Sequence, residues 1–299
     1  MLLLVGTIPV HAGEVFCGPV GVRNGKFYVA ETELPACQGS AAMAMAAFSV
    51  TQHFGMPDPV ALFGGDSGHG DGTRAVYRAF EETLTSQVLA RNKRVEQGVD
   101  EPIVIVFHYL LPVMSLMKHA FETIQRIAPE ALLVADAGGM YAARAAGLGS
   151  KFELMTPDVG EIGFLAEEGA THPAYVADYL FGTENFDVKQ LVEKAYALNT
   201  AARVLIVKGS TDYVASRDSA PHHLVATLSE PNIPELEAIG GTGDTITGLS
   251  GAFMSCGLGT VEAARKALKL NREAGAKLHA QVYTSVSKII AEFGSIMHP

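Results

Sequence analysis

The stretch EAIGGTGDTITGLSGAF (237–253) combines a glycine-rich turn, one acid and an apolar run of helical character. A helix N-terminus leaves backbone N–H groups unpaired and carries partial positive charge, so it attracts anions. Glycines before such a helix let a ligand approach the backbone closely, because no Cβ intervenes. The turn therefore predicts a phosphate site and a helix that begins near Asp244. The residues expected to hold the phosphate are Gly240, Gly241, Thr242 and Gly243.

Asp244 stands at the exit of this turn, and two roles fit it. A carboxylate beside a phosphate site can accept the proton of a substrate hydroxyl while the hydroxyl oxygen attacks phosphorus. An aspartate at a helix start can equally serve only as the helix cap. The turn is not a Walker loop, because no Lys-Ser or Lys-Thr pair closes it. The sequence predicts Asp244 as a catalytic base, with capping as the alternative.

A second glycine-rich loop follows an apolar run at 59–65 and precedes a helical pattern at 72–92. The density of glycine in this loop favours close approach of a ligand. The loop is not a dinucleotide fingerprint, because an acid stands where the second close-approach glycine belongs. A flexible turn with solvated acids is the alternative. The residues predicted to line a substrate pocket are Gly64, Gly65, Asp66 and Gly68.

Short apolar runs alternate with longer helical patterns along the chain. Strands are predicted at 2–8, 59–65, 102–108, 131–137, 152–157 and 202–209. Helices are predicted at 40–55, 72–92, 115–128 and 187–199, the last with Asp187 as its N-cap. The segments DYVAS and HLVATLS predict a small antiparallel excursion, and the chain after the glycine turn has a mostly helical pattern.

Continuous apolar strands separated by helices are typical of a parallel sheet covered on both faces. We therefore expect an α/β fold, with a single domain over residues 1–299, a mostly parallel central sheet and helices on both faces. Functional residues should gather at the carboxyl ends of the strands. Asp136 ends one strand and is a candidate for the substrate pocket, with capping of the next helix as its alternative. The other unusual strand-end residues are 64–66, His108, 156–158 and 208–209.

Composition limits the classes of partner. Hydrophobic residues make up 48% of the 299 residues and charged residues 18%, so a sizeable core can form. The net charge of −10 argues against a nucleic acid bound through its backbone, but local N–H groups can still hold a nucleotide phosphate. Three scattered cysteines indicate a reducing cytoplasm, and the histidines show no zinc spacing. The start MLLLVGTIPV lacks a basic n-region and predicts a strand, and no apolar run predicts a membrane span.

The motif GGTGDTITG (240–248) resembles the Gly-Thr-Gly-Asp signature of the ribokinase-like superfamily. Within it, the chain is most similar to the nucleotide-dependent NAD(P)H-hydrate dehydratases, a carbohydrate-kinase-like branch. The resemblance covers the chain from its start to about residue 260. Further matching segments are LFGGDSGHGDG (62–72), LLVADAGGM (132–140), LMTPDVGEIGFL (154–165) and VLIVKGSTDYV (204–214).

The chain also departs from the pattern of this branch. Asp158 and Val159 follow Pro157 where the dehydratases usually have His-Pro. The loop 62–72 lacks the usual proline, and DAGGM lacks the second acid of the family. These departures fall on the expected substrate side, so they leave the superfamily intact and the substrate open.

The resemblance implies roles for two further groups of residues. Lys208 and Gly209 match a segment that faces the nucleotide in relatives, and a lysine that only snorkels to solvent is the alternative for Lys208. Asp158 and Glu161, three residues apart, match an Asn-x-x-Glu segment that helps place hydrated magnesium near the phosphates. Ordinary first-turn acids are the alternative for this pair. The implied cofactors are ATP or ADP and Mg²⁺.

Three functions remain open from the sequence. The first is a dehydratase that phosphorylates the hydroxyl of hydrated NADH or NADPH and then eliminates phosphate. The second is a kinase that leaves the phosphate on a small alcohol, such as a sugar or a vitamin precursor. The third is a non-catalytic nucleotide sensor. The expected partners are a nucleotide and a small-molecule substrate, with no nucleic acid and no membrane, and a homo-oligomer stays an option.

Overall fold

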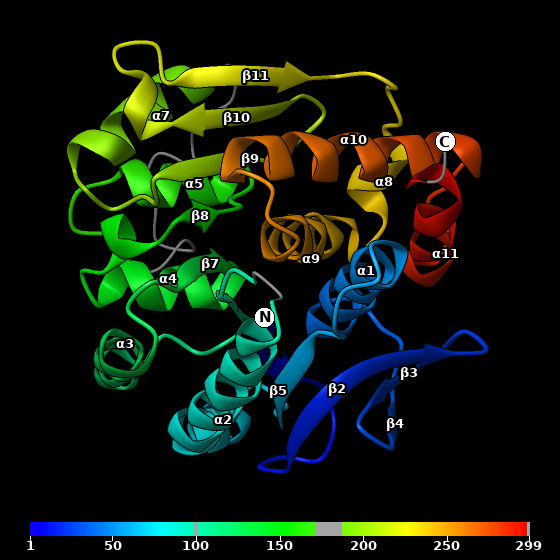
Figure 1. Cartoon of the computed structure of the whole chain (residues 1–299). Helices are drawn as coiled ribbons and strands as arrows, with labels where there is room; N and C mark the ends of the chain where they lie inside the picture. The colour runs from blue at the N-terminus through cyan, green and yellow to red at the C-terminus, as the bar shows by residue number, and fades with distance from the viewer. Residues whose placement is uncertain (99–100, 171–186, 298–299) are drawn as a thin grey trace.

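In the computed structural model, which describes residues 1–98, 101–170 and 187–297, eleven strands form one sheet flanked by helices (Figure 1). The strand order is β11-β10-β9-β8-β7-β6-β1-β5-β2-β3-β4. The run from β9 to β5 is parallel, and both edges of the sheet are antiparallel. The predicted α/β fold with a large central parallel sheet is therefore confirmed.

The central strands are the apolar runs of the sequence, and their side chains are almost entirely buried. Alternate residues of β1 join two different hydrophobic clusters, one on each face of the sheet. The pairing of β6 with β1 and β7 sets His108 level with Gly6 and Asp136. The parallel strands are β1 (Leu2–Ile8), β5 (Val60–Gly65), β6 (Val104–His108), β7 (Leu132–Asp136), β8 (Leu154–Met155) and β9 (Val204–Val207).

The sequence predicted the strands of one antiparallel edge of the sheet but not those of the other. At one edge β10 (Asp212–Ser216) and β11 (Leu224–Leu228) form the predicted excursion. The other edge had no predicted strand. It consists of β2 (Val15–Arg23), β3 (Lys26–Val29) and β4 (Thr32–Leu34). Only two of the nine residues of β2 are fully buried, so this strand lacks the continuous apolar run that identifies the central ones.

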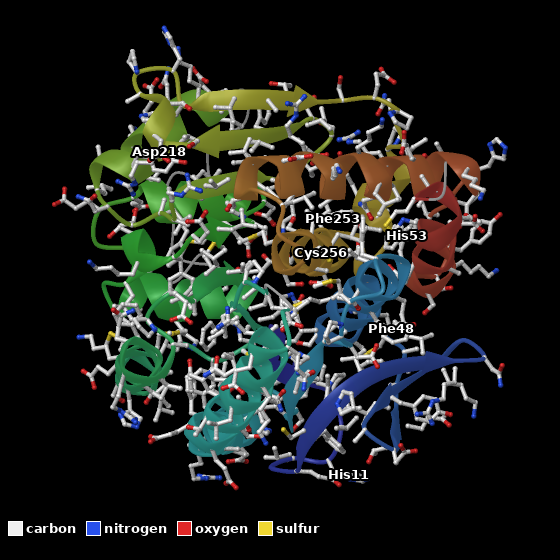
Figure 2. All side chains as sticks on the ribbon, in the orientation of Figure 1. His11, Phe48, His53, Asp218, Phe253 and Cys256 are labelled. Carbon is white, nitrogen blue, oxygen red and sulfur yellow. The ribbon has the colours of Figure 1, made fainter. Side chains whose placement is uncertain are left out.

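Helices cover both faces of the sheet (Figure 1). Figure 2 labels Phe48 and His53 of α1 and Phe253 of α9 on one of these helical layers. The helices of this layer are α1 (Ser40–His53), α9 (Thr242–Ser255), α10 (Thr260–Lys277) and α11 (Val286–Met297). The opposite layer holds α2 (Asp71–Glu96), α3 (Met114–Ile127), α4 (Ala137–Ala145), α5 (Val159–Ala166) and α7 (Val188–Ala197).

Helices α1 and α9 pack along one another, which places their N-terminal ends near the carboxyl ends of the central strands. The short helix α8 (Glu235–Ala238) leads into the glycine turn, and α9 begins at Thr242, two residues before the predicted start. Asp187 caps α7 as predicted, through its bond from the N–H of Lys189. No helix in the described part of the chain is both long and apolar enough to cross a membrane.

Candidate active site at the start of helix α9

Asp244 is the third residue of α9, yet it does not cap this helix. The N-cap is Gly241, and no side chain caps the turn. Asp244 Oδ2 instead accepts a hydrogen bond of 2.7 Å from the N–H of Gly39, and its Oδ1 lies 3.0 Å from Nε2 of His108. The residue is 8% exposed. Its carboxylate therefore points away from its own helix, toward residues that come from α1 and β6.

The surroundings of Asp244 favour its ionised form. Burial raises the pKa of its carboxyl, but the hydrogen bond from His108, the charge of Lys208 and the N–H of Gly39 together lower this pKa by more than burial raises it. The net effect holds the pKa of Asp244 below its ordinary value. An ionised carboxylate is the form that can accept a proton, so the site keeps Asp244 ready to act as a base.

The ammonium group of Lys208 is held in place by the buried carboxylate of Asp136. The ammonium nitrogen lies 3.0 and 3.1 Å from the two carboxylate oxygens of Asp136. Burial lowers the pKa of Lys208, but the carboxylates of Asp136, Glu161 and Asp244 outweigh it and raise the pKa overall. Asp136 also accepts from Thr247 Oγ1 at 2.6 Å and from the N–H of Ala137. The ammonium thus stays charged in a fixed position next to the glycine turn.

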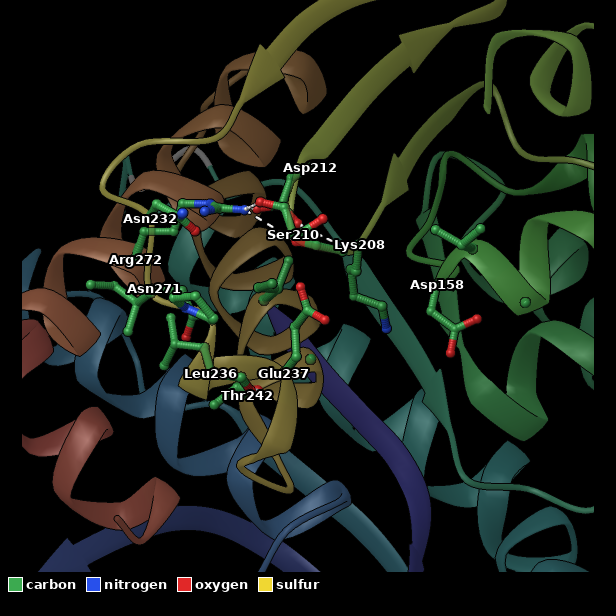
Figure 3. Close-up of a pocket in the computed structure, with 17 residues that line it drawn as sticks. Asp158, Lys208, Ser210, Asp212, Asn232, Leu236, Glu237, Thr242, Asn271 and Arg272 are labelled. Carbon is green, nitrogen blue, oxygen red and sulfur yellow. Dashed lines mark hydrogen bonds and ion pairs between the residues drawn. The ribbon is translucent and has the colours of Figure 1, made fainter. Parts of the chain in front are cut away.

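Lys208 and the turn face a cavity of about 480 Å³, which we call the Lys208 cavity (Figure 3). Arg272 builds one wall: its guanidinium pairs with Asp212 at 2.7 Å and donates to the carbonyls of Gly209 and Ser210. These bonds hold the loop after β9 in place. The residues that line the cavity include Asp158, Val159, Gly160, Asn232, Leu236, Glu237, Thr242, Gly243, Ile246 and Asn271.

The first turn of α9 leaves donors toward this cavity. Gly241 has φ of +103°, a conformation that side chains rarely adopt, and it turns the chain into the helix. Within the described part of the chain, no hydrogen bond uses the N–H of Gly243 or Asp244. Free N–H groups at a helix start, with the charged Lys208 beside them, form a site suited to an anion such as a phosphate.

A second cavity, of about 300 Å³, is called here the Ser40 cavity. Gly39, the backbone partner of Asp244, belongs to its wall, whereas Gly243, which precedes Asp244 in the chain, belongs to the wall of the Lys208 cavity. The buried carboxylate is thus next to a wall residue of each cavity. The full lining of the Ser40 cavity consists of Thr7, Ile8, Pro9, Gln38, Gly39, Ser40, Asp66, Gly68, Thr73, Tyr109 and Leu111.

The second glycine-rich loop contributes to the Ser40 cavity less than predicted. Asp66 lines it but accepts from the N–H groups of Gly68, Gly70 and Thr73, so it also holds the loop together. Burial raises the pKa of Asp66, and these N–H groups lower it to a net value below the ordinary one.

The interpretation of Gly64 and Gly65 as pocket-lining residues is corrected by their packing. A Cβ on Gly64 would meet the backbone of Gly72 at 2.4 Å, and one on Gly65 would meet the carbonyl oxygen of His11. These two glycines are required by close contact of the chain with itself, and neither lines the Lys208 or the Ser40 cavity.

Asp158 and Glu161 form a reciprocal cap at the start of α5. Asp158 Oδ1 accepts from the N–H of Glu161 at 2.7 Å, and Glu161 Oε2 accepts from the N–H of Asp158 at 2.9 Å. The other Glu161 oxygen accepts from the hydroxyl of Tyr141. Burial raises the pKa of Glu161 to about 7; Lys208 opposes the rise, and Asp136 and Asp158 add to it. The structure thus shows the helix-start role for both acids.

A family model described as NAD(P)H-hydrate dehydratase matches residues 104–292, which include both walls of the Lys208 cavity and Asp244. The chain belongs to this family. The match begins at β6, so the segment 62–72, which the sequence assigned to a family loop, lies outside it, and the match extends past residue 260 to the last helix.

Other comparisons give one relative in sequence and several similar folds. An uncharacterized protein of Methanocaldococcus jannaschii, MJ1337, is 35% identical over 245 residues, which cover 82% of this chain and 94% of that protein. Phosphofructokinase-2 from Escherichia coli in complex with potassium has a TM-score of 0.52 at 12% identity, with 100% and 99% of the two chains covered. Pyridoxal kinase from Entamoeba histolytica has a TM-score of 0.52 at 12% identity, with 98% and 94% covered. These two structures show that the dehydratase-family chain has a ribokinase-like fold.

The structure brings many of the sequence-predicted residues of this family member together. Thr242, Gly243, Lys208, Gly209 and Asp158 line the Lys208 cavity. Others support the site from outside it. Asp136 is 1% exposed, caps α4 and pairs with Lys208, so the structure shows it in a supporting position, and its contact with substrate stays a prediction. Gly240 lies against the side chain of Gln38.

Sequence reasoning missed the groups that hold Asp244 and Lys208. Gly39 and Ser40 stand at the start of an alanine-rich helix, which is a weak sign of a site. His108 was noted only as an unusual residue at a strand end, and no partner was predicted for it. Thr247 lies one helical turn after Asp244 and bonds Asp136. One sequence does not reveal which strand end faces which helix start, so these pairings required the fold.

Proposed function

We propose that this protein transfers the terminal phosphoryl group of a nucleotide to a substrate hydroxyl, with Asp244 as the base. The observation that carries the proposal is that buried Asp244 is next to a wall residue of each cavity: Gly243 precedes it and lines the cavity with free helix N–H groups and a fixed lysine, and Gly39 bonds its carboxylate and lines the Ser40 cavity. The nucleotide phosphates occupy the Lys208 cavity beside Gly243. The acceptor hydroxyl enters from the Ser40 cavity.

The chemistry follows from this arrangement. Asp244 takes the proton of the hydroxyl, and the oxygen forms a bond to the terminal phosphorus as the bond to the leaving nucleotide oxygen breaks. Lys208 and the N–H groups of Gly243 and Asp244 stabilise the negative charge on the transferring group, because they are already oriented. The ammonium of Lys208 needs no reorganisation, since Asp136 holds it.

The dehydratase reaction adds one step to this transfer. In a hydrated dihydronicotinamide, the phosphate on the phosphorylated carbon leaves with the bonding electrons, and the neighbouring carbon loses a proton. A carbon–carbon double bond forms, and the products are the dihydronicotinamide and inorganic phosphate. We propose hydrated NADH or NADPH as the substrate, because the chain belongs to the dehydratase family.

The lining of the Ser40 cavity supports an uncharged reacting group. Its lining residues, as far as the structure describes the chain, include no lysine or arginine, and its one acid, Asp66, is already engaged by three N–H groups of its own loop. The ring of Tyr109 forms part of the wall, and burial raises the pKa of this residue to about 12, so the ring stays neutral. The ring of a hydrated dihydronicotinamide is uncharged, so it suits a wall that includes a neutral aromatic side chain. The charged remainder of the dinucleotide then lies outside this cavity.

The family resemblance also implies Mg²⁺, and the residues present fit it in part. Both oxygens of Glu161 already accept hydrogen bonds, from Asp158 and from Tyr141. Asp158 is exposed, lines the Lys208 cavity and has, among the described residues, no hydrogen bond to its Oδ2. A bound cation would neutralise phosphate charge. We therefore propose that Asp158, rather than Glu161, holds a hydrated Mg²⁺ near the phosphates.

The deciding experiment is product analysis of the purified protein with hydrated NADH, Mg²⁺ and either ATP or ADP. We expect one inorganic phosphate released for each dihydronicotinamide chromophore regained, and no stable phosphoester. A stable phosphoester by mass spectrometry would instead identify a kinase and remove the elimination step. The protein could instead bind nucleotide without turning over hydrated NADH or any of a panel of small alcohols. That result would contradict the enzymatic proposal and support a nucleotide sensor.

A magnesium titration tests the proposed metal contact separately. In Asp158→Asn, the asparagine still caps α5 but loses the charge, so we expect the Mg²⁺ concentration for half-maximal rate to rise. Glu161→Gln is the matched variant and should leave that concentration nearly unchanged. The opposite order of effects would move the metal contact to Glu161.

A further inference from the structure

Ser40, His108 and Asp244 form a continuous hydrogen-bonded line through the interior. Ser40 Oγ lies 3.0 Å from Nδ1 of His108, and His108 Nε2 lies 3.0 Å from Asp244 Oδ1. Ser40 is 2% exposed and His108 is fully buried. The three residues come from α1, β6 and α9, so segments far apart in the sequence meet at this point.

Gly6 of β1 makes the meeting possible. A Cβ at this position would lie 2.5 Å from the carbonyl oxygen of His108 and 2.7 Å from Ser40 Oγ. Any side chain there would separate the serine from the imidazole. The hydrogen bond between Ser40 and His108 therefore depends on a glycine at this position of the central strand.

The chemistry of the partners fixes the direction of the hydrogen bonds. Asp244 is held in its ionised form and can only accept, so Nε2 of His108 must carry the hydrogen. In a neutral imidazole Nδ1 is then the acceptor, and the hydroxyl of Ser40 donates to it. Ser40 thereby selects the tautomer that can donate to the carboxylate.

We propose that His108 is a positioning residue for Asp244, and that Ser40 sets the imidazole tautomer required for this task. With Gly39 on one carboxylate oxygen and His108 on the other, the carboxylate can neither rotate nor turn toward its own helix. Its remaining lone pairs stay directed at the incoming hydroxyl, and a base that is misplaced by an ångström loses about 10²-fold in rate.

The charges around the pair set the expected pH response. Lys208 faces it from the residue after β9, Asp136 from the end of β7, Tyr109 from the residue after β6 and Cys37 from the segment before α1. Of the groups that lower the pKa of Asp244, His108 makes the largest contribution. Its removal should therefore move the acid limb of the rate profile to higher pH, because Asp244 would be protonated more readily.

This inference rests on the proposed function for its kinetic readout. In His108→Phe we expect kcat to fall about 10²-fold with KM for the nucleotide nearly unchanged, and the acid limb of kcat/KM to move to higher pH. His108→Gln keeps an N–H donor and should recover part of the loss. Ser40→Ala should cost about fivefold in kcat, the equivalent of one hydrogen bond. His223→Gln is the control, since His223 bonds the carbonyl of Ser216 at the far edge of the sheet.

The outcomes separate the two proposals. If the wild type turns over and His108→Phe has the same kcat and the same acid limb, the positioning role is overturned and the proposed function stands. Absence of wild-type turnover would overturn the function, and the line would then be tested without substrate. For that test, nitrogen NMR of histidine-labelled protein should show His108 as the Nε2–H tautomer, lost in His108→Gln, and an Nδ1–H tautomer would contradict the proposal. Folding of each variant is checked by its thermal melt.

Discussion

Helices α5 and α9 both start beside the Lys208 cavity, and each carries an aspartate at its beginning. Asp158 turns back onto its own helix and accepts from the N–H of Glu161. Asp244 turns away from its helix and bonds Gly39 and His108. The same residue type therefore satisfies the start of one helix and leaves the start of the other open.

The difference shows how a site can be distinguished from a cap. A capped helix start has its donors occupied, so it has less to offer an anion. An uncapped start held by glycine keeps its donors free, and its acid is available for chemistry. The sequence left both interpretations open for both aspartates, and the hydrogen bonds assign one interpretation to each helix.

The largest expected effect concerns Asp244. Asp244→Asn should lower turnover by about 10²- to 10⁴-fold, because an amide cannot accept the hydroxyl proton. Nucleotide binding should survive, since the glycine turn and Lys208 are intact. Asp187→Asn is the matched control: Asp187 caps α7, asparagine caps equally well, and kcat should not change. A wild-type kcat in Asp244→Asn would show that Asp244 is not the catalytic base.

The sequence predicted the central strands and the glycine turn because their signals are local. Continuous apolar runs identify β1, β5 and β6, and GGTGD identifies the start of α9. The three strands at 15–34 were missed because none of them carries a continuous apolar run. The partners of Asp244 were missed for a different reason. Gly39 is 205 residues away along the chain and His108 is 136, so only the packing of α1 and β6 reveals them.

The second prediction concerns the pH dependence of the α5 start. Burial raises the pKa of Glu161 from 4.5 to about 7. Between these values the folded state binds more protons than the unfolded state, so the free energy of unfolding falls as pH rises through this window. Glu161→Gln removes this dependence, and the two stability curves should diverge by on the order of 1–3 kcal/mol from pH 4.5 to above 7. Denaturant melts across this range measure the difference, and parallel curves would contradict it.

The third prediction separates two glycines of the α9 start. Gly241→Ala should destabilise the fold by about 1–2 kcal/mol, because φ is +103° and Val286 lies 3.1 Å from the added Cβ. Gly243→Ala should keep the fold, since its Cβ would meet only Lys208 at 3.5 Å. Calorimetric titration with ADP should still show weaker binding for Gly243→Ala, because the methyl group enters the Lys208 cavity. Native affinity in that variant would move the phosphates away from the turn.

The smallest expected effect is the loss of stability when the Asp158 cap of α5 is removed. Asp158→Ala removes the acceptor for the N–H of Glu161 and should cost about 1 kcal/mol, whereas Asp158→Asn keeps an acceptor and should cost only a few tenths. For a chain of this size the alanine variant should melt about 1–2 °C lower.

Both Asp158 variants lose the same negative charge, so their magnesium requirements should rise equally while their melting temperatures differ. Asp244 offers the opposite comparison. Alanine and asparagine at position 244 should both abolish most of the turnover, because neither accepts a proton, and neither removes a cap from α9. Equal melting temperatures for Asp158→Ala and Asp158→Asn would show that the α5 cap contributes nothing measurable. The contrast between the two helix starts would then rest on Asp244 alone.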